Sequence, residues 1–316
     1  MNNITNYLGI IALIGGIILP VLNQNTATDN LASLAIESKS VTLSNISAPS
    51  WYIEKIDVEN IWNNGNSGAN VIVAVLDTGI DATNQDLAGK VVDSINFSTS
   101  TTTNDENGHG TAVAGVIAAS LENGKGVTGV AFNASLLNVK VANDSGIINP
   151  EAVVEGINWA IEKGAKVINL SFTLSKANEM VENAINYAWS QGAVIIAAAG
   201  NTAGSNKTYP AAYQNVIAVA ATDKDDSICK WSNNGNWISV SAPGVDICTT
   251  VANGEYAMKN GTSFSAPLVS GEAALLMAIT LDANGNGNTN DEVRAAILNN
   301  TDAGRINIEK AIENIN

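Results

Sequence analysis

Apolar residues along this chain follow two spacings that alternate from about Ala48 to the C-terminus. Continuous apolar runs of strand length predict five buried strands, at residues 71–77, 135–141, 165–172, 193–200 and 216–222. Between them, Pro150 to Lys163 and Asn178 to Gln191 carry apolar residues at helical spacing, and a glycine follows each segment. This alternation predicts an α/β fold, a doubly wound and mostly parallel sheet with helices on both faces.

The N-terminal part of the chain has a different pattern. Residues 8–22 are a 15-residue apolar run, LGIIALIGGIILPVL, with no Lys or Arg ahead of it. The run is shorter than the ~20 residues of a membrane-spanning helix, which favours a signal peptide within residues 1–27 and a secreted protein. A retained anchor with an extracytoplasmic catalytic domain and a buried core helix are the alternatives. Residues 28–47 are polar and predict a linker or short pro-segment, and residues 48–316 predict one folded domain.

Charge and residue counts exclude several classes of protein. The chain has 30 acidic and 15 basic residues, a net charge of -15, which would repel nucleic acid. Two cysteines and one histidine argue against a disulfide-rich scaffold and against structural zinc. Cys229 and Cys248 form either one disulfide or two buried thiols. We expect a monomer that binds no nucleic acid.

Polar residues follow several predicted strands, at the edge of the sheet where functional residues gather in such folds. Asp77 ends one strand, Ser171 ends another, and Asn201 follows a third. Each residue alone is also an ordinary turn residue. The pattern therefore indicates where a site lies, without defining its chemistry.

Four short segments supply the chemistry: VLDTGID with Asp77, NGHGTAVAG with His109, AAAGN with Asn201 and NGTSFSAP with Ser263. A serine hydroxyl needs a base, and His109 is the only histidine that could serve. Asp77 could orient that imidazole, while the Asn201 side chain and the Ser263 backbone N–H could stabilise an oxyanion. Helix caps and turns are the structural alternative for each residue taken singly.

These segments, in the order Asp, His, Asn, Ser, closely resemble the subtilase family and its thermitase-like branch, from about Trp51 to the C-terminus. The resemblance implies a subtilisin-like three-layer sandwich and a serine endopeptidase that hydrolyses proteins and peptides. It also implies a catalytic triad of Asp77, His109 and Ser263, with Asn201 in the oxyanion hole. A catalytically silent scaffold or binding protein on the same fold is the alternative.

By the same resemblance, substrate binds as an added strand between Gly146-Ile147-Ile148 and Ser171-Phe172-Thr173. Gly200 and Thr208 would border the main specificity pocket, and the family usually has glycine where Thr173 stands. Residues 23–47 are too few for the folded propeptide of the family. We therefore expect folding without that helper, or with a propeptide-type inhibitor supplied in trans.

The segment Gly124 to Gly129 fits the G-x-G-x-x-G pattern, but it follows a helix predicted from Thr111 to Leu121, which argues against dinucleotide binding. The resemblance implies instead a structural Ca²⁺ site formed by Asp86, Asn123 and nearby carbonyls such as that of Val127. A second calcium loop of the family corresponds to residues 96–105, which lack its run of aspartates, so we expect that site to be absent. The stretch from Asp282 to Gly287 predicts either an Asn/Gly turn or an incomplete EF-hand loop.

Overall fold

In a computed structural model of the protein, residues 37–41, 50–120, 126–174 and 176–315 are described. The strands are β1 (Glu37–Val41), β2 (Ile72–Asp77), β3 (Val91–Asn96), β4 (Ser135–Lys140), β5 (Val167–Leu170), β6 (Val194–Ala198), β7 (Val216–Thr222), β8 (Val240–Pro243), β9 (Ile247–Val251), β10 (Glu255–Asn260), β11 (Thr301–Asp302) and β12 (Arg305–Ile306). The helices are α1 (Trp51–Lys55), α2 (Glu59–Asn63), α3 (His109–Ala118), α4 (Pro150–Glu162), α5 (Glu179–Ser190), α6 (Thr262–Met277), α7 (Asn290–Asn299) and α8 (Ile308–Glu313). The order of elements is the predicted alternation of strands and helices.

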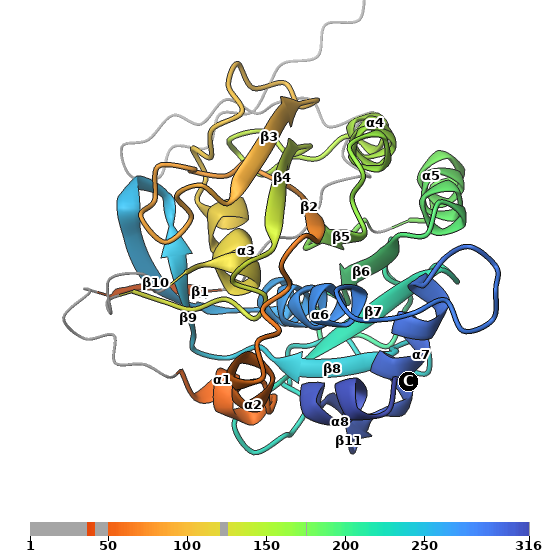
Figure 1. The fold of residues 1–316 in the computed structure, drawn as a ribbon. Helices are drawn as coiled ribbons and strands as arrows, with labels where there is room; N and C mark the ends of the chain where they lie inside the picture. Colours follow the sequence, from red (N-terminus) through yellow and green to blue (C-terminus); the bar gives the residue numbers. More distant parts are fainter. Residues whose placement is uncertain (1–36, 42–49, 121–125, 175, 316) are drawn as a thin grey trace, which may run out of the picture.

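The central sheet has nine strands in the order β11-β12-β8-β7-β6-β5-β2-β4-β3 (Figure 1). Its pairs are parallel apart from the β11–β12 hairpin at one edge. Strand β2 lies between β4 and β5, so the carboxyl end of β2 lies well inside the sheet. This end carries Asp77.

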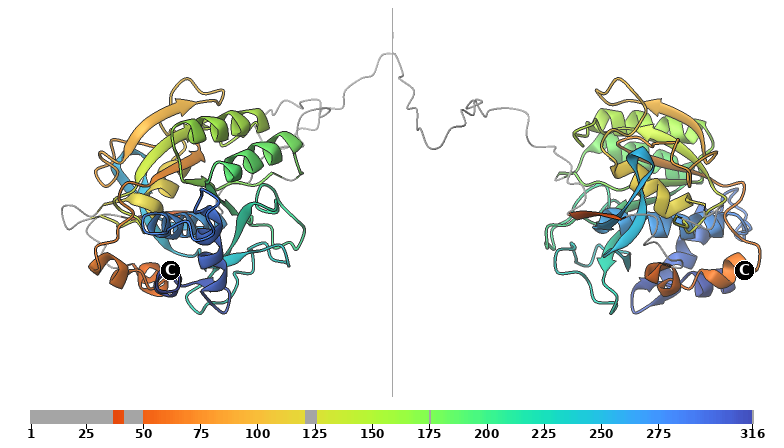
Figure 2. Two further views of the ribbon diagram at one scale, coloured as in Figure 1. Left: turned by 45° about the vertical axis from the view of Figure 1, so that its right-hand side comes forward. Right: turned by 90° about the vertical axis from the view of Figure 1, so that its left-hand side faces the viewer.

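The two faces of the sheet bury different side chains of the same strands. In β2, Val73 and Val75 pack into one hydrophobic cluster with residues of α3 and α6, while Ala74 and Leu76 pack into another with residues of α4 and α5. Figures 1 and 2 show α4 and α5 side by side on one face and α3 and α6 on the other. The predicted doubly wound α/β architecture, three layers deep, is confirmed.

A smaller antiparallel sheet has the order β1-β10-β9. Strand β1 pairs with β10 from Glu37 opposite Asn260 to Val41 opposite Tyr256. A strand therefore lies inside the segment 28–47 that the sequence predicts as a linker or pro-segment. The apolar run at 8–22 lies outside the described residues, and within the described ranges no helix is long and apolar enough to cross a bilayer.

Cys229 and Cys248 are buried free thiols, so the disulfide alternative is wrong. Burial raises the pKa of each thiol to about 11. Both groups are consequently protonated at neutral pH.

Candidate active site

Three segments far apart in sequence bring Asp77, His109 and Ser263 to one region. Asp77 is the last residue of β2, His109 begins α3, and Ser263 is the second residue of α6. The helices α3 and α6 pack against each other on one face of the sheet. All three side chains are buried, with exposed fractions of 1%, 5% and 1%.

The contact between Asp77 and His109 is short and direct. Asp77 Oδ1 lies 2.8 Å from His109 Nδ1, and the Thr78 N–H donates to the same oxygen at 2.7 Å. The opposite ring nitrogen, Nε2, is buried and has no hydrogen-bond partner among the described residues. The carboxylate thus orients the imidazole through Nδ1 and leaves Nε2 free to accept a proton.

Ser263 makes a reciprocal contact with Ser171. The Ser263 Oγ donates to the Ser171 carbonyl at 3.0 Å, and the Ser171 Oγ donates to the Ser263 carbonyl at 2.9 Å. The second bond is available because Pro267, four residues later in α6, has no N–H for that carbonyl. No hydrogen bond joins Ser263 to His109 in this structure, although the Phe264 ring centroid lies 5.6 Å from that of His109. Such bonds are often unformed without substrate.

Asn201 is fixed through its side-chain oxygen. Asn201 Oδ1 accepts bonds from the backbone N–H and the hydroxyl of Thr262, each at 3.0 Å, and the Thr262 hydroxyl accepts from the Gly200 N–H. The amide Nδ2 has no partner in the described part of the chain and can donate to a ligand. Gly261, with φ of 144°, turns the chain from β10 into α6, whose first N–H groups lack intrahelical acceptors. Two donors, Asn201 Nδ2 and Ser263 N–H, are therefore available beside the serine hydroxyl.

The predicted substrate-binding segments differ in what they expose. Ile147 is 49% exposed. The Asn143 N–H donates to the Ile147 carbonyl, and the Ile147 N–H donates to the Asn143 side-chain oxygen, at 3.0 Å each. Ser171 and Phe172 are buried, so their side chains present no exposed surface to a ligand. Thr173 lies against Gly200, because a Cβ added at Gly200 would come within 3.1 Å of the Thr173 methyl group.

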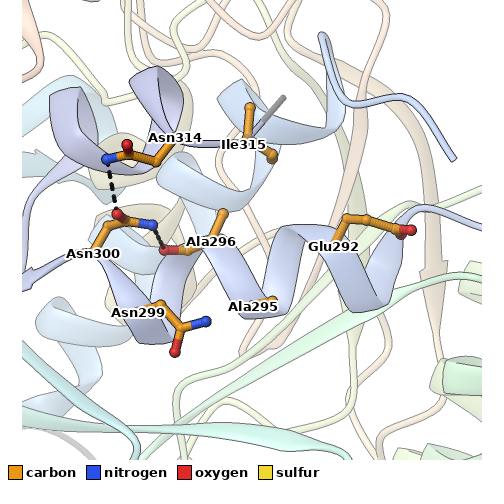
Figure 3. Close-up of a pocket in the computed structure, with 7 residues that line it drawn as sticks. All are labelled: Glu292, Ala295, Ala296, Asn299, Asn300, Asn314 and Ile315. Atoms are coloured by element: carbon orange, nitrogen blue, oxygen red, sulfur yellow. Dashed lines mark hydrogen bonds between the residues drawn. The ribbon is translucent and has the colours of Figure 1, made fainter. Parts of the chain in front are cut away.

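Thr208 contacts the same region: its hydroxyl donates to the Ala199 carbonyl at 2.6 Å. Residues 173, 199, 200 and 208 therefore lie close together next to Asn201. A separate hollow of about 460 Å³ shares none of these residues (Figure 3). It is lined by Glu292, Ala295, Ala296, Asn299, Asn300, Asn314 and Ile315.

Asp86 is buried beside the segment 126–127. Its Oδ2 accepts bonds from the Val127 N–H and the Tyr256 hydroxyl, both at 2.9 Å. Burial raises the pKa of Asp86, and these two bonds oppose the rise. A Cβ at Gly126, with φ of 110°, would lie 2.1 Å from this oxygen, so only glycine lets the loop approach the carboxylate.

Asp86 supplies carboxylate oxygens, the ligand type that calcium prefers, and its Oδ2 already accepts the Val127 N–H and the Tyr256 hydroxyl. Asn123 lies outside the described residues. Among those described, no group of three or more His, Cys, Asp or Glu could hold a metal. In the second candidate loop, the Asp282 carboxylate accepts the backbone N–H groups of Gly285, Asn286 and Gly287, the pattern of a polar turn.

Sequence reasoning missed three buried polar residues near or behind the site. Thr78 and Asp105 link the segments of Asp77 and His109, and Glu272 lies in the core within α6. Thr78 is part of the DTG segment, and Asp105 stands four residues before His109, yet neither position has a pattern that identifies a role. Glu272 interrupts an apolar helix, a signal that could have been noticed.

Comparisons with known proteins identify the family of the chain. The pattern that defines the subtilase family matches residues 68–313. Thermitase from Thermoactinomyces vulgaris is 39% identical over 271 residues, covering 82% of this chain and 94% of thermitase. A thermophilic serine proteinase from Bacillus sp. (strain AK1) is 42% identical over 239 residues, 75% of this chain and 57% of the relative. Subtilisin DY from Bacillus licheniformis is 42% identical over 231 residues, 72% of this chain and 83% of that protein.

Proposed function

This chain belongs to the subtilase family and is a serine endopeptidase, and on that premise we propose that Asp77, His109 and Ser263 form its catalytic triad. The observation that supports this assignment best is the 2.8 Å contact between Asp77 and His109 Nδ1, with Nε2 free beside the Ser263 segment. Asn201 and the Ser263 N–H form the oxyanion hole.

The proposed reaction begins when Ser263 Oγ rotates from the Ser171 carbonyl toward His109. The hydroxyl proton passes to Nε2 as Oγ attacks the substrate carbonyl carbon, and Asp77 stabilises the imidazolium that forms. The tetrahedral oxyanion accepts hydrogen bonds from Asn201 Nδ2 and the Ser263 N–H. The imidazolium then protonates the leaving amine, and water removes the acyl group from Ser263 by the same steps.

Substrate is proposed to bind as an extended strand between residues 146–148 and 171–173. The side chain before the scissile bond would enter the region bordered by Gly200 and Thr208. Thr173 narrows this region, because its methyl group lies where a glycine would leave space. We infer a preference for medium-sized apolar or polar side chains.

The test substitutes the triad residues one at a time and measures casein hydrolysis and labelling of the nucleophilic serine by a fluorophosphonate probe. Ser263→Ala and His109→Ala should each remove nearly all casein hydrolysis, and the magnitude is borrowed from subtilisin itself, about 10⁶-fold. Asn201→Ala should cost about 10² to 10³-fold. Ser265→Ala is the matched control, because that hydroxyl lies two residues along α6 and donates to the Pro243 carbonyl. Hydrolysis that survives Ser263→Ala at a tenth of the wild-type rate would contradict the assignment.

We also propose a structural Ca²⁺ ion held by Asp86, the Val127 carbonyl and Asn123. The proposal is supported by the buried Asp86 carboxylate and the close approach of the loop at Gly126. When bound, the ion would compensate the buried negative charge and fasten the loop to the body of the protein. No step of hydrolysis passes through it.

For the whole chain we propose export as a monomer, with residues 1–27 as signal peptide, 28–47 as a short pro-segment and 48–316 as the catalytic domain. The apolar run at 8–22 supports export. A propeptide-type inhibitor acting in trans would bind the substrate edges. N-terminal sequencing of protein from the culture medium tests the boundary, and an N-terminus at Met1 would contradict it.

A further inference from the structure

Thr78 connects the two segments that carry Asp77 and His109. Its N–H donates to Asp77 Oδ1 at 2.7 Å, the oxygen that also contacts His109. Its hydroxyl accepts a bond from the Gly110 N–H at 3.0 Å, one residue after His109. The same hydroxyl donates to Asp105 Oδ1 at 2.8 Å. The N–H of Thr78 thus holds the Asp77 carboxylate, while its hydroxyl joins the end of β2 to the start of α3 and to Asp105.

Asp105 is 1% exposed and accepts bonds on both sides of His109. Oδ1 accepts from the Gly108 N–H at 2.8 Å and the Asn107 N–H at 3.1 Å. Oδ2 accepts from the Thr111 N–H at 2.8 Å and its hydroxyl at 2.6 Å. With the Thr78 hydroxyl, five donors point at one carboxylate, which fills its acceptor capacity.

The surroundings leave little freedom for this network. A Cβ at Gly110 would lie 2.1 Å from the Gly79 carbonyl oxygen, so the two backbones are already in contact. The buried Lys140 ammonium binds the Thr78 carbonyl and, at 2.8 Å, the Asn104 carbonyl just before Asp105. The Lys259 ammonium also interacts electrostatically with Asp105. A shift of the Thr78 hydroxyl would therefore be transmitted to both ends of the Asp77–His109 contact.

We propose that Thr78 and Asp105 are positioning residues that hold Asp77 and His109 at reactive geometry. Neither residue exchanges a proton with substrate. The fully buried Asp105 carboxylate fixes the start of α3 and, through the Thr78 hydroxyl, the end of β2. This inference rests on the proposed triad, because Thr78 and Asp105 can affect catalysis in this way only if Asp77 and His109 act together in the reaction.

The experiment compares Thr78→Val, which keeps the shape and removes the hydroxyl, with Thr78→Ser, which keeps the hydroxyl. Thr83→Val is the matched control, because the exposed Thr83 side chain also donates its hydroxyl to a carboxylate, that of Asp81, and makes no hydrogen bond to Thr78 or Asp105. Thr78→Val should lower kcat about tenfold to a hundredfold, the range expected for a small misplacement of reacting groups. KM should stay within about twofold. Thr78→Ser should restore most of the activity, and Thr83→Val should match the wild type.

The pH profile separates positioning from mere stability. A misaligned Asp77 stabilises the imidazolium less, so the acid limb of kcat/KM should move to lower pH in Thr78→Val and not in Thr83→Val. Each variant is first titrated with a fluorophosphonate. A wild type that does not react overturns the triad and this inference together. A reactive wild type with unchanged kcat in Thr78→Val, or no recovery in Thr78→Ser, overturns the positioning role alone.

Discussion

Glu272 is a carboxylic acid in the core of the helix that begins at Ser263. It is 0% exposed, and neither carboxyl oxygen has a hydrogen-bond partner in the described part of the chain. Residues on every side of α6 are buried, so the side chain has no route to water along the helix surface. Burial raises the pKa of Glu272 from its ordinary value near 4.5 to about 8.

The sign of the resulting pH dependence follows from proton binding. Below pH 4.5 the folded and unfolded states both hold the proton, and the full stability is present. Between 4.5 and about 8 the unfolded state has lost this proton and the folded state has kept it, so stability falls as the pH rises. The slope is about 1.4 kcal/mol per pH unit, and from pH 5 to pH 8 the loss is about 3 to 4 kcal/mol.

Urea unfolding of wild type and Glu272→Gln at several pH values measures this loss. Both proteins carry Ser263→Ala to prevent self-digestion, and other titrating groups cancel in the comparison. The stability of Glu272→Gln relative to wild type should increase by about 3 to 4 kcal/mol from pH 5 to pH 8. Glu155→Gln, at an exposed position on α4, is the control and should leave the difference flat. A pH-independent difference for Glu272→Gln would refute the burial of a protonated carboxyl.

Chelation should lower the melting temperature if Ca²⁺ binds at Asp86, because an ion at a hundred times its Kd contributes about 2.7 kcal/mol. Asp86→Ala should shrink that difference, and a midpoint indifferent to chelator would exclude the site. Phe264 follows Ser263 and has no oxidisable sulfur, so millimolar peroxide should inactivate a Cys-to-Ser background slowly and its Phe264→Met variant quickly. Equal rates would contradict this. Cys229 and Cys248 should react with a disulfide reagent only after unfolding, since both are buried with pKa near 11; rapid labelling of native protein would disprove it.

The regular elements could be predicted closely because each apolar run ends in polar or glycine residues. Strand β7 has the predicted bounds, and helix α4 ends at Glu162, one residue early. Helix α3 begins at His109 although apolar periodicity places its start at Thr111. The start of a helix depends on a turn at Gly108, with φ of 89°, that hydrophobic spacing does not encode.

The internal connections of the site could not be predicted, because they depend on side-chain rotamers and contacts across the fold. Nothing near Ser171 in the sequence indicates that its hydroxyl donates to the Ser263 carbonyl. That carbonyl is available because Pro267 has no N–H to donate to it. The burial of Glu272 likewise requires knowing that α6 is surrounded on all sides, whereas a charged residue in a helix ordinarily marks an exposed face. Strand β1 (ESKSV) lacks an apolar run, so hydrophobic spacing does not indicate its pairing with β10.

The location of Glu272 on the same helix as Ser263 bears on any change of activity between pH 5 and pH 8, the range in which its buried carboxyl lowers the stability of the fold. Nine residues separate the two, about 14 Å along the helix axis. At that distance two unit charges interact by about 1 kcal/mol at an effective dielectric constant of 20, so the direct effect of a Glu272 charge on groups near Ser263 is small. The effect on folding is three to four times larger. Raising the pH from 5 to 8 should therefore reduce the fraction of folded enzyme more in the wild type than in Glu272→Gln, while kcat per fluorophosphonate-reactive site stays nearly equal in the two proteins.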